Sequence, residues 1–382
     1  MTATTTHPVR TLHTDVSARP FMVIWEVTRA CQLACRHCRA DAQHHRDPRE
    51  LTTAQGKALL DDLASFGAPR PMVILTGGDP FEREDLAELV AHGDAAGLHM
   101  SISPSVTPRL TRAALAEMRA AGAHAVSLSL DAADASVHDA IRGIPGVFDA
   151  TLAAARTARE VGLRLQVNTT VTKATVPQLP GVLALVADLD VALWSVFFLV
   201  PTGRGEQLVA VTPDEAEEVM HWLHDVSHVV PVKTTEAPQF RRIALQRAEV
   251  ADVDTAFPAG PLRTELRAAT ERLLGDRARG EHRARPPLAV NAGRGFAFVS
   301  HVGEVYPSGF LPLPVGSLHD LPFTDIYCDA PLLRVLRDPD RLGGKCGRCD
   351  YRTVCGGSRS HAYAVTGDPL AEDPTCAYLP AG

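Results

Sequence analysis

The sequence predicts an α/β fold: a partial (β/α)6 barrel followed by a small C-terminal cysteine-rich α+β extension. Short apolar runs alternate with amphipathic stretches from about residue 21 to about residue 228, which is typical of strand–helix units. Glycines such as Gly67, Gly97 and Gly122 stand where helix C-caps belong. Because a closed barrel of this class has eight units, six units predict an open one. A cluster of cysteines near the C-terminus predicts the extension.

Each apolar run is expected to be a strand and each stretch between the runs a helix. The expected strands are Phe21–Val27, Met72–Thr76, His99–Ser103, Ala125–Leu130, Leu163–Val171 and Leu193–Val200. The expected helices are Thr53–Phe66, Arg83–Ala96, Thr111–Ala121, Val147–Val161, Gln178–Leu189 and Pro213–Val226. Since a helix follows each strand, the strands should be parallel and joined by right-handed crossovers.

The pattern weakens after the sixth unit. A helix is expected over Thr264–Leu274, an arginine-rich linker over Asp276–Arg285, a hairpin over Phe296–Ser300 and Glu304–Pro307, and a helix over Phe323–Leu336. The expected regions are therefore a polar tail (1–20), the barrel (21–230), a bridging segment and linker (231–286) and the extension (287–382).

The composition is that of an ordinary globular protein. The 382 residues include 38 Lys and Arg against 45 Asp and Glu, a net charge of -7, which does not indicate a nucleic-acid surface. Neither a signal peptide nor an apolar run long enough to span a membrane is present. We therefore expect a cytoplasmic protein, in which clustered cysteines indicate metal or redox chemistry.

Cys31, Cys35 and Cys38 come directly after the first strand, with the spacing Cys-x3-Cys-x2-Cys. In α/β barrels that end of the strands carries the chemistry. Three thiolates can hold a [4Fe-4S] cluster and leave one iron open. The alternatives are three buried core cysteines or a zinc site; the polar residues Gln32 and Arg36 argue against the first, and the single Cys-x2-Cys arm against the second.

This motif resembles the signature of the radical S-adenosylmethionine (SAM) superfamily, with His37 at the position that is usually aromatic. The resemblance implies that the open iron chelates the amino and carboxylate groups of SAM. An electron from the cluster then releases a 5'-deoxyadenosyl radical, which abstracts hydrogen from the substrate. It also implies an electron donor such as flavodoxin or ferredoxin, and a reaction of the oxidoreductase or lyase type.

Gly77, Gly78 and Asp79 follow the second strand, where the family usually has Gly-Gly-Glu. Glycines allow close backbone approach to a ligand, and a carboxylate can accept a hydrogen bond from the ammonium group of SAM. The alternative is a simple turn between strand and helix. The resemblance favours SAM binding.

Further SAM contacts are expected at the ends of later strands. Ser127 and Ser129 share one face of the fourth strand, and Arg142 suits a carboxylate; for each alone, a capping or surface role is the alternative. Ser103 stands where relatives often have Thr-Asn-Gly, and Asn168 on the fifth strand would complete the adenosine rim.

A second set comprises Cys346, Cys349, Cys355 and Cys376. Four thiolates suit a closed site, either iron–sulfur or zinc. The region resembles the SPASM extension or its shorter relative, twitch. The full SPASM form has seven cysteines and two auxiliary clusters, but Ser308 stands at one expected cysteine position. Since three ligands of one cluster are missing, we expect a single auxiliary [4Fe-4S] cluster. Cys328 is expected to be a packing residue.

The resemblance also narrows the substrate. The segment Gly295–Pro312 is similar to a radical SAM/SPASM subfamily related to the enzymes of the alternative haem and haem d1 pathways, which act on porphyrinoid side chains, for example by oxidative decarboxylation. A maturase of ribosomally made peptides is the rival, and a non-enzymatic iron–sulfur electron carrier is a third hypothesis. The candidate substrate residues are Lys233, Glu236, Arg241, Arg242, His301 and Arg204.

Overall fold

The computed structural model describes residues 8–10, 12, 14–279 and 285–380. Its strands form one ten-stranded sheet in the order β10-β9-β8-β1-β2-β3-β4-β5-β6-β7. The seven strands of the barrel are parallel: β1 Met22–Thr28, β2 Met72–Gly77, β3 His99–Ile102, β4 Ala125–Ser129, β5 Arg164–Val171, β6 Leu193–Phe198 and β7 Val232–Thr235. Within the described residues no strand pairing joins β7 to β10, so the barrel is open.

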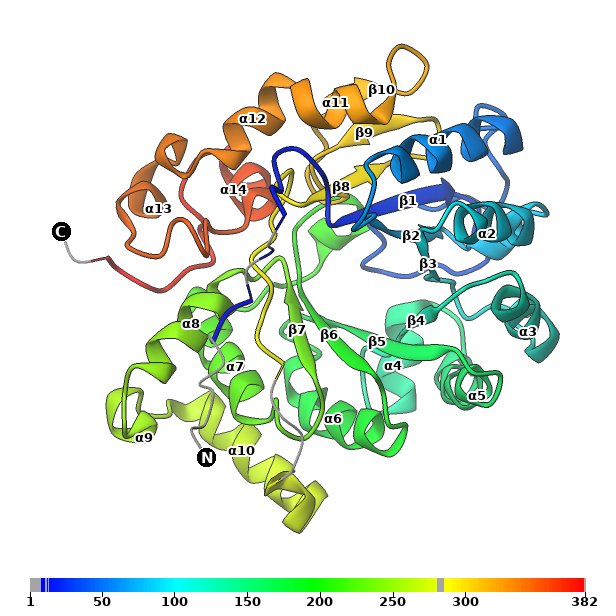
Figure 1. Ribbon diagram of the computed structural model, residues 1–382. Coiled ribbons are helices and arrows are strands. Elements are labelled where there is room, and N and C mark those ends of the chain that lie inside the picture. Colours follow the sequence, from blue (N-terminus) through cyan, green and yellow to red (C-terminus); the bar gives the residue numbers. More distant parts are fainter. Residues whose placement is uncertain (1–7, 11, 13, 280–284, 381–382) are drawn as a thin grey trace, which may run out of the picture.

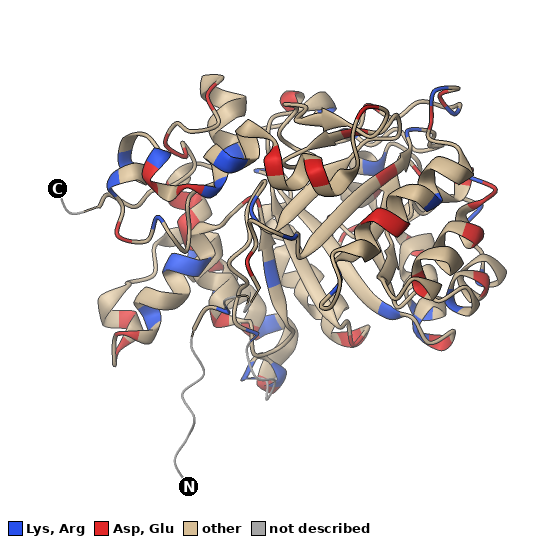
Figure 2. Ribbon diagram, turned by 45° about the horizontal axis from the view of Figure 1, so that its top comes forward, with Lys and Arg blue, Asp and Glu red and all other residues tan. Residues whose placement is uncertain are grey.

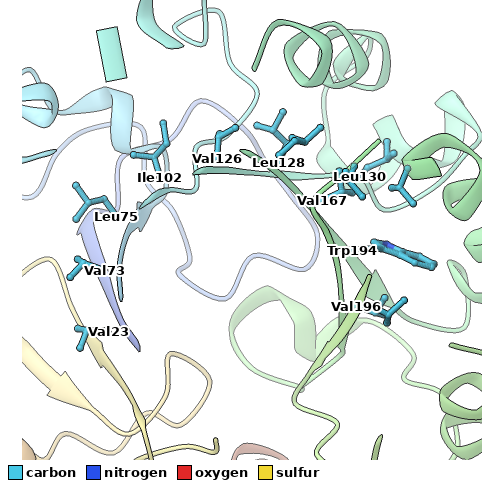
Figure 3. Close-up of a cluster of buried hydrophobic side chains, with 14 of the residues drawn as sticks. Val23, Val73, Leu75, Ile102, Val126, Leu128, Leu130, Val167, Trp194 and Val196 are labelled. Atoms are coloured by element: carbon cyan, nitrogen blue, oxygen red, sulfur yellow. The ribbon is translucent and has the colours of Figure 1, made fainter. Parts of the chain in front are cut away.

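Helices cover the outer face of this curved sheet (Figure 1). They are α1 Thr53–Ser65, α2 Leu86–Ala95, α3 Arg112–Ala120, α4 Ala135–Arg142, α5 Val147–Glu160, α6 Leu179–Asp188 and α7 Pro213–Asp225. Short 3-10 helices, η1 Pro80–Glu82, η2 Val176–Gln178 and η3 Gly203–Gln207, follow β2, β5 and β6. Side chains on the outward face of the strands pack beneath the helices and form the core (Figure 3). Val23, Val73, Leu75, Val126 and Trp194 are completely buried there, and such apolar burial is the main stabilising term of the fold.

The chain returns from the barrel to its first strand. After α8 Gln239–Ala248, α9 Val253–Ala256, α10 Pro261–Leu274 and η4 Gly275–Arg279, strand β8 (Phe296–Val299) pairs in parallel with β1. Strands β9 (Glu304–Tyr306) and β10 (Gly316–Ser317) extend the sheet as antiparallel neighbours. The last helices are α11 Phe323–Asp329, α12 Pro331–Arg337, η5 Pro339–Arg341, α13 Gly344–Arg348 and α14 Arg359–Thr366.

The predicted fold class is confirmed, and several elements differ from the expectation, among them α4 and α8, which were not predicted. Strand β7 adds a seventh parallel strand, which its mixed sequence Val-Lys-Thr-Thr did not indicate. The single helix expected over Phe323–Leu336 is two helices, because Pro331 disfavours a helical conformation at Ala330, whose ψ is 126°. The division into four regions stays a prediction.

Acidic and basic residues are interspersed over the helices rather than gathered in one field (Figure 2). Among the described residues, no helix is both long and apolar enough to cross a membrane.

Candidate active site

A cavity of about 220 Å³ lies at the C-terminal ends of the barrel strands. All three cysteines of the first set line it. So do seven of the nine residues predicted to contact SAM: His37, Gly77, Gly78, Ser103, Ser129, Arg142 and Asn168. The chain therefore brings the predicted thiols and most of their predicted neighbours to one hollow.

The backbone around Cys31 is fixed by hydrogen bonds on both sides. Its N–H donates to Gln43 O at 2.7 Å, and Gln43 N–H donates to Arg29 O at 2.9 Å. These two hydrogen bonds fix the position of the loop where it leaves β1. Cys31 Sγ lies 3.4 Å from Ser105 Oγ and accepts from Leu33 N–H at 3.4 Å. Burial raises the pKa of the Cys31 thiol. A bound metal would offset the free-energy cost of ionising this buried thiol, because metal ligation favours the thiolate.

Arg142 links the second cysteine to a buried carboxylate. Its Nη1 lies 3.7 Å from Cys35 Sγ, while its Nη2 pairs with Asp131 Oδ2. Burial opposes ionisation of Asp131, but the guanidinium of Arg142 outweighs it and lowers the pKa of Asp131 to about 2. His37 Nε2 lies 3.5 Å from the same oxygen, and burial lowers the pKa of His37 to about 4. His37 is therefore a neutral imidazole beside a fixed ion pair.

Asp131 was not among the predicted site residues. It follows β4 directly and is 1% exposed, and its other oxygen accepts from Thr170 N–H at 2.9 Å. The available signal was a carboxylate at the end of a strand, eleven residues before an arginine. Its pairing with Arg142 arises because α4 turns back toward the strand ends, which the spacing alone does not indicate.

Gly77 and Gly78 allow the end of β2 to press against the segment that carries the first cysteines. A Cβ atom on Gly77 would lie 2.2 Å from Thr28 O, and one on Gly78 would lie 2.3 Å from Ala30 O. Gly78 N–H donates to Thr28 O at 2.8 Å across this contact. The two glycines thus place the backbone that leads into Cys31, in addition to lining the cavity.

Replacing Gly78 with alanine is expected to lower the iron content of the first site. The new Cβ collides with a backbone carbonyl that has no side-chain freedom to move away, so the loop before Cys31 must shift. The measurement is iron per chain after anaerobic reconstitution, compared with the wild type and with Gly146→Ala. At Gly146 a Cβ meets no atom within 4 Å, although its φ of 82° is positive whereas that of Gly78 is not. Equal iron content in the two variants would contradict this role of Gly78.

The remaining two predicted SAM contacts lie outside the cavity. Asp79 is completely buried: its Oδ2 accepts from Thr107 Oγ1 at 2.7 Å, and its Oδ1 caps η1 by accepting from Phe81 N–H at 3.2 Å. Burial raises the pKa of Asp79 to about 6. Ser127 faces the barrel interior but lines a second cavity nearer the start of the strands.

The sequence did not single out several other residues of the rim. Thr76, Ser105, Thr170, Phe197 and Phe310 line the cavity with the predicted set. Arg39, also on the rim, donates to Glu26 Oε2 at 2.6 Å. The predicted substrate residue Arg204 lies on this rim, whereas His301 lies 3.2 Å from Glu26 Oε1 behind it.

The four cysteines of the second set line a small cavity of about 20 Å³ between α8 and the C-terminal helices. Backbone N–H groups point at the sulfurs: Asp373 N lies 3.3 Å from Cys346 Sγ, and Gly357 N lies 3.5 Å from Cys355 Sγ. Burial raises the pKa of Cys355 to about 12 and that of Cys376 to about 11. Two buried and two half-buried thiols with this pattern of donors fit a closed metal centre, in which the thiolate form is stabilised.

Cationic groups surround the second set. Arg242 and Lys345 line the same cavity, and Arg359 Nη2 lies 3.7 Å from Cys346 Sγ. These charges oppose the negative charge that four thiolates bring to a cluster. In the described part of the chain, no three His, Cys, Asp or Glu side chains lie close enough together to hold a single metal ion.

Ser308, which stands at an expected cysteine position, belongs to a hydrogen-bonded group. Ser308 Oγ donates to Glu236 Oε1 at 3.1 Å, and Ser358 Oγ donates to its other oxygen. Cys328 lies apart from both sets on α11, with its sulfur 3.4 Å from Ala18 O. Glu236, directly after β7, therefore links the segment that follows β9 to the start of α14.

Comparison with known proteins agrees with this arrangement. Residues 25–178 match the model of the radical SAM superfamily. The chain is 38% identical over 375 residues to the AdoMet-dependent heme synthase of Oleidesulfovibrio alaskensis, covering 97% of this chain and 90% of that protein. It is 30% identical to the Fe-coproporphyrin III synthase of Methanosarcina barkeri, covering 93% and 87%.

The fold has solved counterparts. Streptococcus suis SuiB, in a crystal structure with the precursor peptide SuiA, matches with a TM-score of 0.67 at 15% identity, covering 94% of this chain and 76% of that one. Together with the sequence matches, this confirms the predicted family, whose members use a [4Fe-4S] cluster and SAM. The chain belongs to the radical SAM superfamily and is a radical SAM enzyme.

Proposed function

We propose that this enzyme oxidatively decarboxylates propionate side chains of an iron porphyrinoid in haem synthesis. The observation that carries the proposal is the similarity to an AdoMet-dependent heme synthase along 97% of the chain. The relative named Fe-coproporphyrin III synthase supports the same class of substrate. Iron-coproporphyrin III and haem differ at two positions, where propionates in the first are vinyl groups in the second.

The proposed reaction balances. Each propionate, –CH2–CH2–COO⁻, becomes –CH=CH2 plus CO2, one proton and two electrons. When bound, the cluster and SAM supply a carbon radical that removes one hydrogen atom, and hence one of these electrons, from the side chain. The second electron is transferred to a one-electron acceptor that contains an iron–sulfur cluster. We further propose that the enzyme works in the cytoplasm with flavodoxin or ferredoxin as its reductant.

The residues of the first cavity have separate parts in this proposal. Cys31, Cys35 and Cys38 would hold the cluster, and Arg142 would fix Cys35 while the Asp131 carboxylate holds its guanidinium in place. Apolar side chains of the cavity wall, such as Leu199, would exclude water from the reacting carbon. The cavity residues proposed to lie around SAM are His37, Gly77, Gly78, Ser103, Ser129 and Asn168.

The test is anaerobic incubation of the reconstituted enzyme with reductant, SAM and iron-coproporphyrin III. We expect haem to form, with loss of CO2 and two hydrogens from each of two propionates and one 5'-deoxyadenosine for each vinyl group, all measured by mass spectrometry. Formation of 5'-deoxyadenosine with an unchanged porphyrin would contradict the substrate, and modification of a precursor peptide instead would identify a maturase.

We also propose that the second cysteine set holds one auxiliary [4Fe-4S] cluster. Two cubane clusters predict roughly eight irons per chain after reconstitution. Cys355→Ala removes a buried ligand and should leave about four, all at the first site. Iron and zinc analysis of both proteins checks this. Four irons with one zinc in the wild type would exclude the auxiliary cluster.

A further inference from the structure

A second cavity, of about 260 Å³, occupies the barrel interior at the end of the strands opposite to the first cysteines. The first residue of every strand from β1 to β8 lines it: Met22, Met72, His99, Ala125, Arg164, Leu193, Val232 and Phe296. Inward-facing residues two positions further along β2 to β5 line it as well: Ile74, Ser101, Ser127 and Gln166. The cavity therefore lies along the barrel axis, below the candidate active site.

Among the described residues that line this second cavity, five are Arg or Lys and one is acidic. The bases are Arg10, Arg164, Lys233, Arg241 and Arg285. This excess is local, since the whole chain has a net charge of -7. The single carboxylate, Glu236, already accepts hydrogen bonds from Ser308 and Ser358. The cavity thus has a strongly positive lining that its own acid does not neutralise.

Lys233 on β7 is one of these cations whose charged group has no partner in the described part of the chain. Within the described residues, no hydrogen bond or ion pair reaches its ammonium group. Burial, with the nearby charge of Arg285, lowers the pKa of Lys233 to about 8. Lys233 is half-buried, and an ammonium that is partly withdrawn from water without a counterion is costly, which favours an anionic ligand in this cavity.

Two buried arginines elsewhere in this protein are paired with carboxylates. Arg83 is bound to Asp85 at 2.6 Å and Arg263 to Asp225 at 2.9 Å. Arg164 and Arg285, which are exposed, and Lys233, which is half-buried, have no carboxylate partner among the residues that the structure describes. Three cations without such a partner therefore line this cavity.

Apolar side chains form much of the remaining lining, with Phe21, Met22, Met72, Ile74, Leu288 and Phe296 among its walls, beside hydroxyl and amide groups such as those of Ser101 and Gln166. A cavity with apolar walls and several unpaired cations suits an apolar ring that carries more than one carboxylate. The two cavities also meet along the strands. Ser127 lines the second and Ser129 the first, and Gln166 Nε2 of the second donates to Asn168 Oδ1 of the first at 2.7 Å.

We propose that the second cavity binds carboxylate side chains of the porphyrinoid, with Lys233 as their principal ion-pair partner. This inference rests on the proposed function. A ring anchored there by some of its carboxylates would extend along the barrel axis and present another side chain to the first cysteines. The same cations would discriminate against porphyrins whose propionates are esterified or absent.

The test compares binding of iron-coproporphyrin III to the wild type and to Lys233→Met, by titration of the Soret band under anaerobic conditions. Removing the cation should weaken binding about 10-fold or more. Lys233→Arg should retain most of the affinity, because the charge remains. The matched control is Lys173→Met: this lysine pairs with Glu215, is 42% exposed and should leave binding unchanged.

The tetramethyl ester of the same porphyrin gives a second comparison. Since the ester carries no carboxylates, the wild type and Lys233→Met should bind it equally. Iron content and the cluster absorption check that each variant is folded. If Lys233→Met does not fold, Arg164→Met at the exposed mouth replaces it, with the same expected direction.

The outcomes separate the two proposals. If the wild type binds and converts iron-coproporphyrin III while Lys233→Met binds it equally well, the carboxylate subsite is wrong and the proposed function stands. If the wild type neither binds nor converts the porphyrin, both are wrong. Weaker binding by Lys233→Met that disappears with the ester supports the subsite.

Discussion

Replacement of Cys35 by alanine is expected to reduce 5'-deoxyadenosine formation to the level of a sample without enzyme. Cys35 is one of three thiols that line the cavity at the strand ends, and Arg142 reaches its sulfur at 3.7 Å. With two thiols remaining, a cubane has two iron atoms without protein ligands, so the chelation of SAM at a single open iron is lost. The measurement is 5'-deoxyadenosine after anaerobic incubation with dithionite and SAM.

Cys328→Ala is the matched control for this experiment. Cys328 lies on α11, outside both cysteine sets, and accounts for one of the eight free cysteines. Its removal should leave both the iron content and the yield of 5'-deoxyadenosine unchanged. Continued product formation by Cys35→Ala would mean that the catalytic cluster is held elsewhere. Absence of product even in the wild type would favour an electron carrier over an enzyme.

The second large effect is expected on stability, from Arg142→Met. This change leaves the Asp131 carboxylate 1% exposed and without its cation. Removing one partner of a buried ion pair typically costs about 3–5 kcal/mol. We therefore expect the free energy of unfolding at pH 7, measured in urea, to fall by about this amount. Arg112→Met, which removes an exposed partner of Glu160, should cost less than about 1 kcal/mol.

The pH dependence of this effect has a definite sign. Although burial raises it, the Arg142 guanidinium holds the folded-state pKa of Asp131 at about 2, below the ordinary value of 3.8 for this carboxyl. The ion pair therefore stabilises the fold fully above pH 3.8, and its contribution is lost as the pH falls through 2. In Arg142→Met the buried carboxyl has a raised pKa instead, so the stability difference between variant and wild type should shrink on acidification.

A double variant tests whether the unpaired charge is the cause. Asp131→Asn combined with Arg142→Met removes both charges and should recover part of the loss, because no uncompensated carboxylate remains. A double variant as unstable as Arg142→Met alone would instead point to lost packing of the long arginine side chain.

The sequence predicted the six strands well because their outward faces are fully buried. Runs such as Met72–Thr76 contain side chains that are completely covered by helices, and this leaves a clear apolar signal. Strand β7 was missed for the opposite reason. Its residues Lys233, Thr234 and Thr235 line a charged cavity, so three of the four residues of the strand are polar. Polar strand interiors give no periodic apolar pattern.

Within the candidate site, spacing predicted which residues gather but not how side chains point. The cysteine sets follow from their short separations along the chain. The direction of Asp79 does not, because its carboxylate is drawn away from the cavity by Thr107 and by the start of η1. Similarly, the contact between Asp131 and Arg142 depends on the orientation of α4, which packing decides.

The pairing of β8 with β1 has a consequence for biosynthesis. The strand that leads into the first cysteines has one edge bonded to β2 and the other to a segment made in the last quarter of the chain. While the polypeptide leaves the ribosome, that edge has no partner and offers free backbone groups to other nascent chains. Truncation before Phe296 should therefore yield aggregates, and insertion of iron and sulfide should follow release of the finished polypeptide.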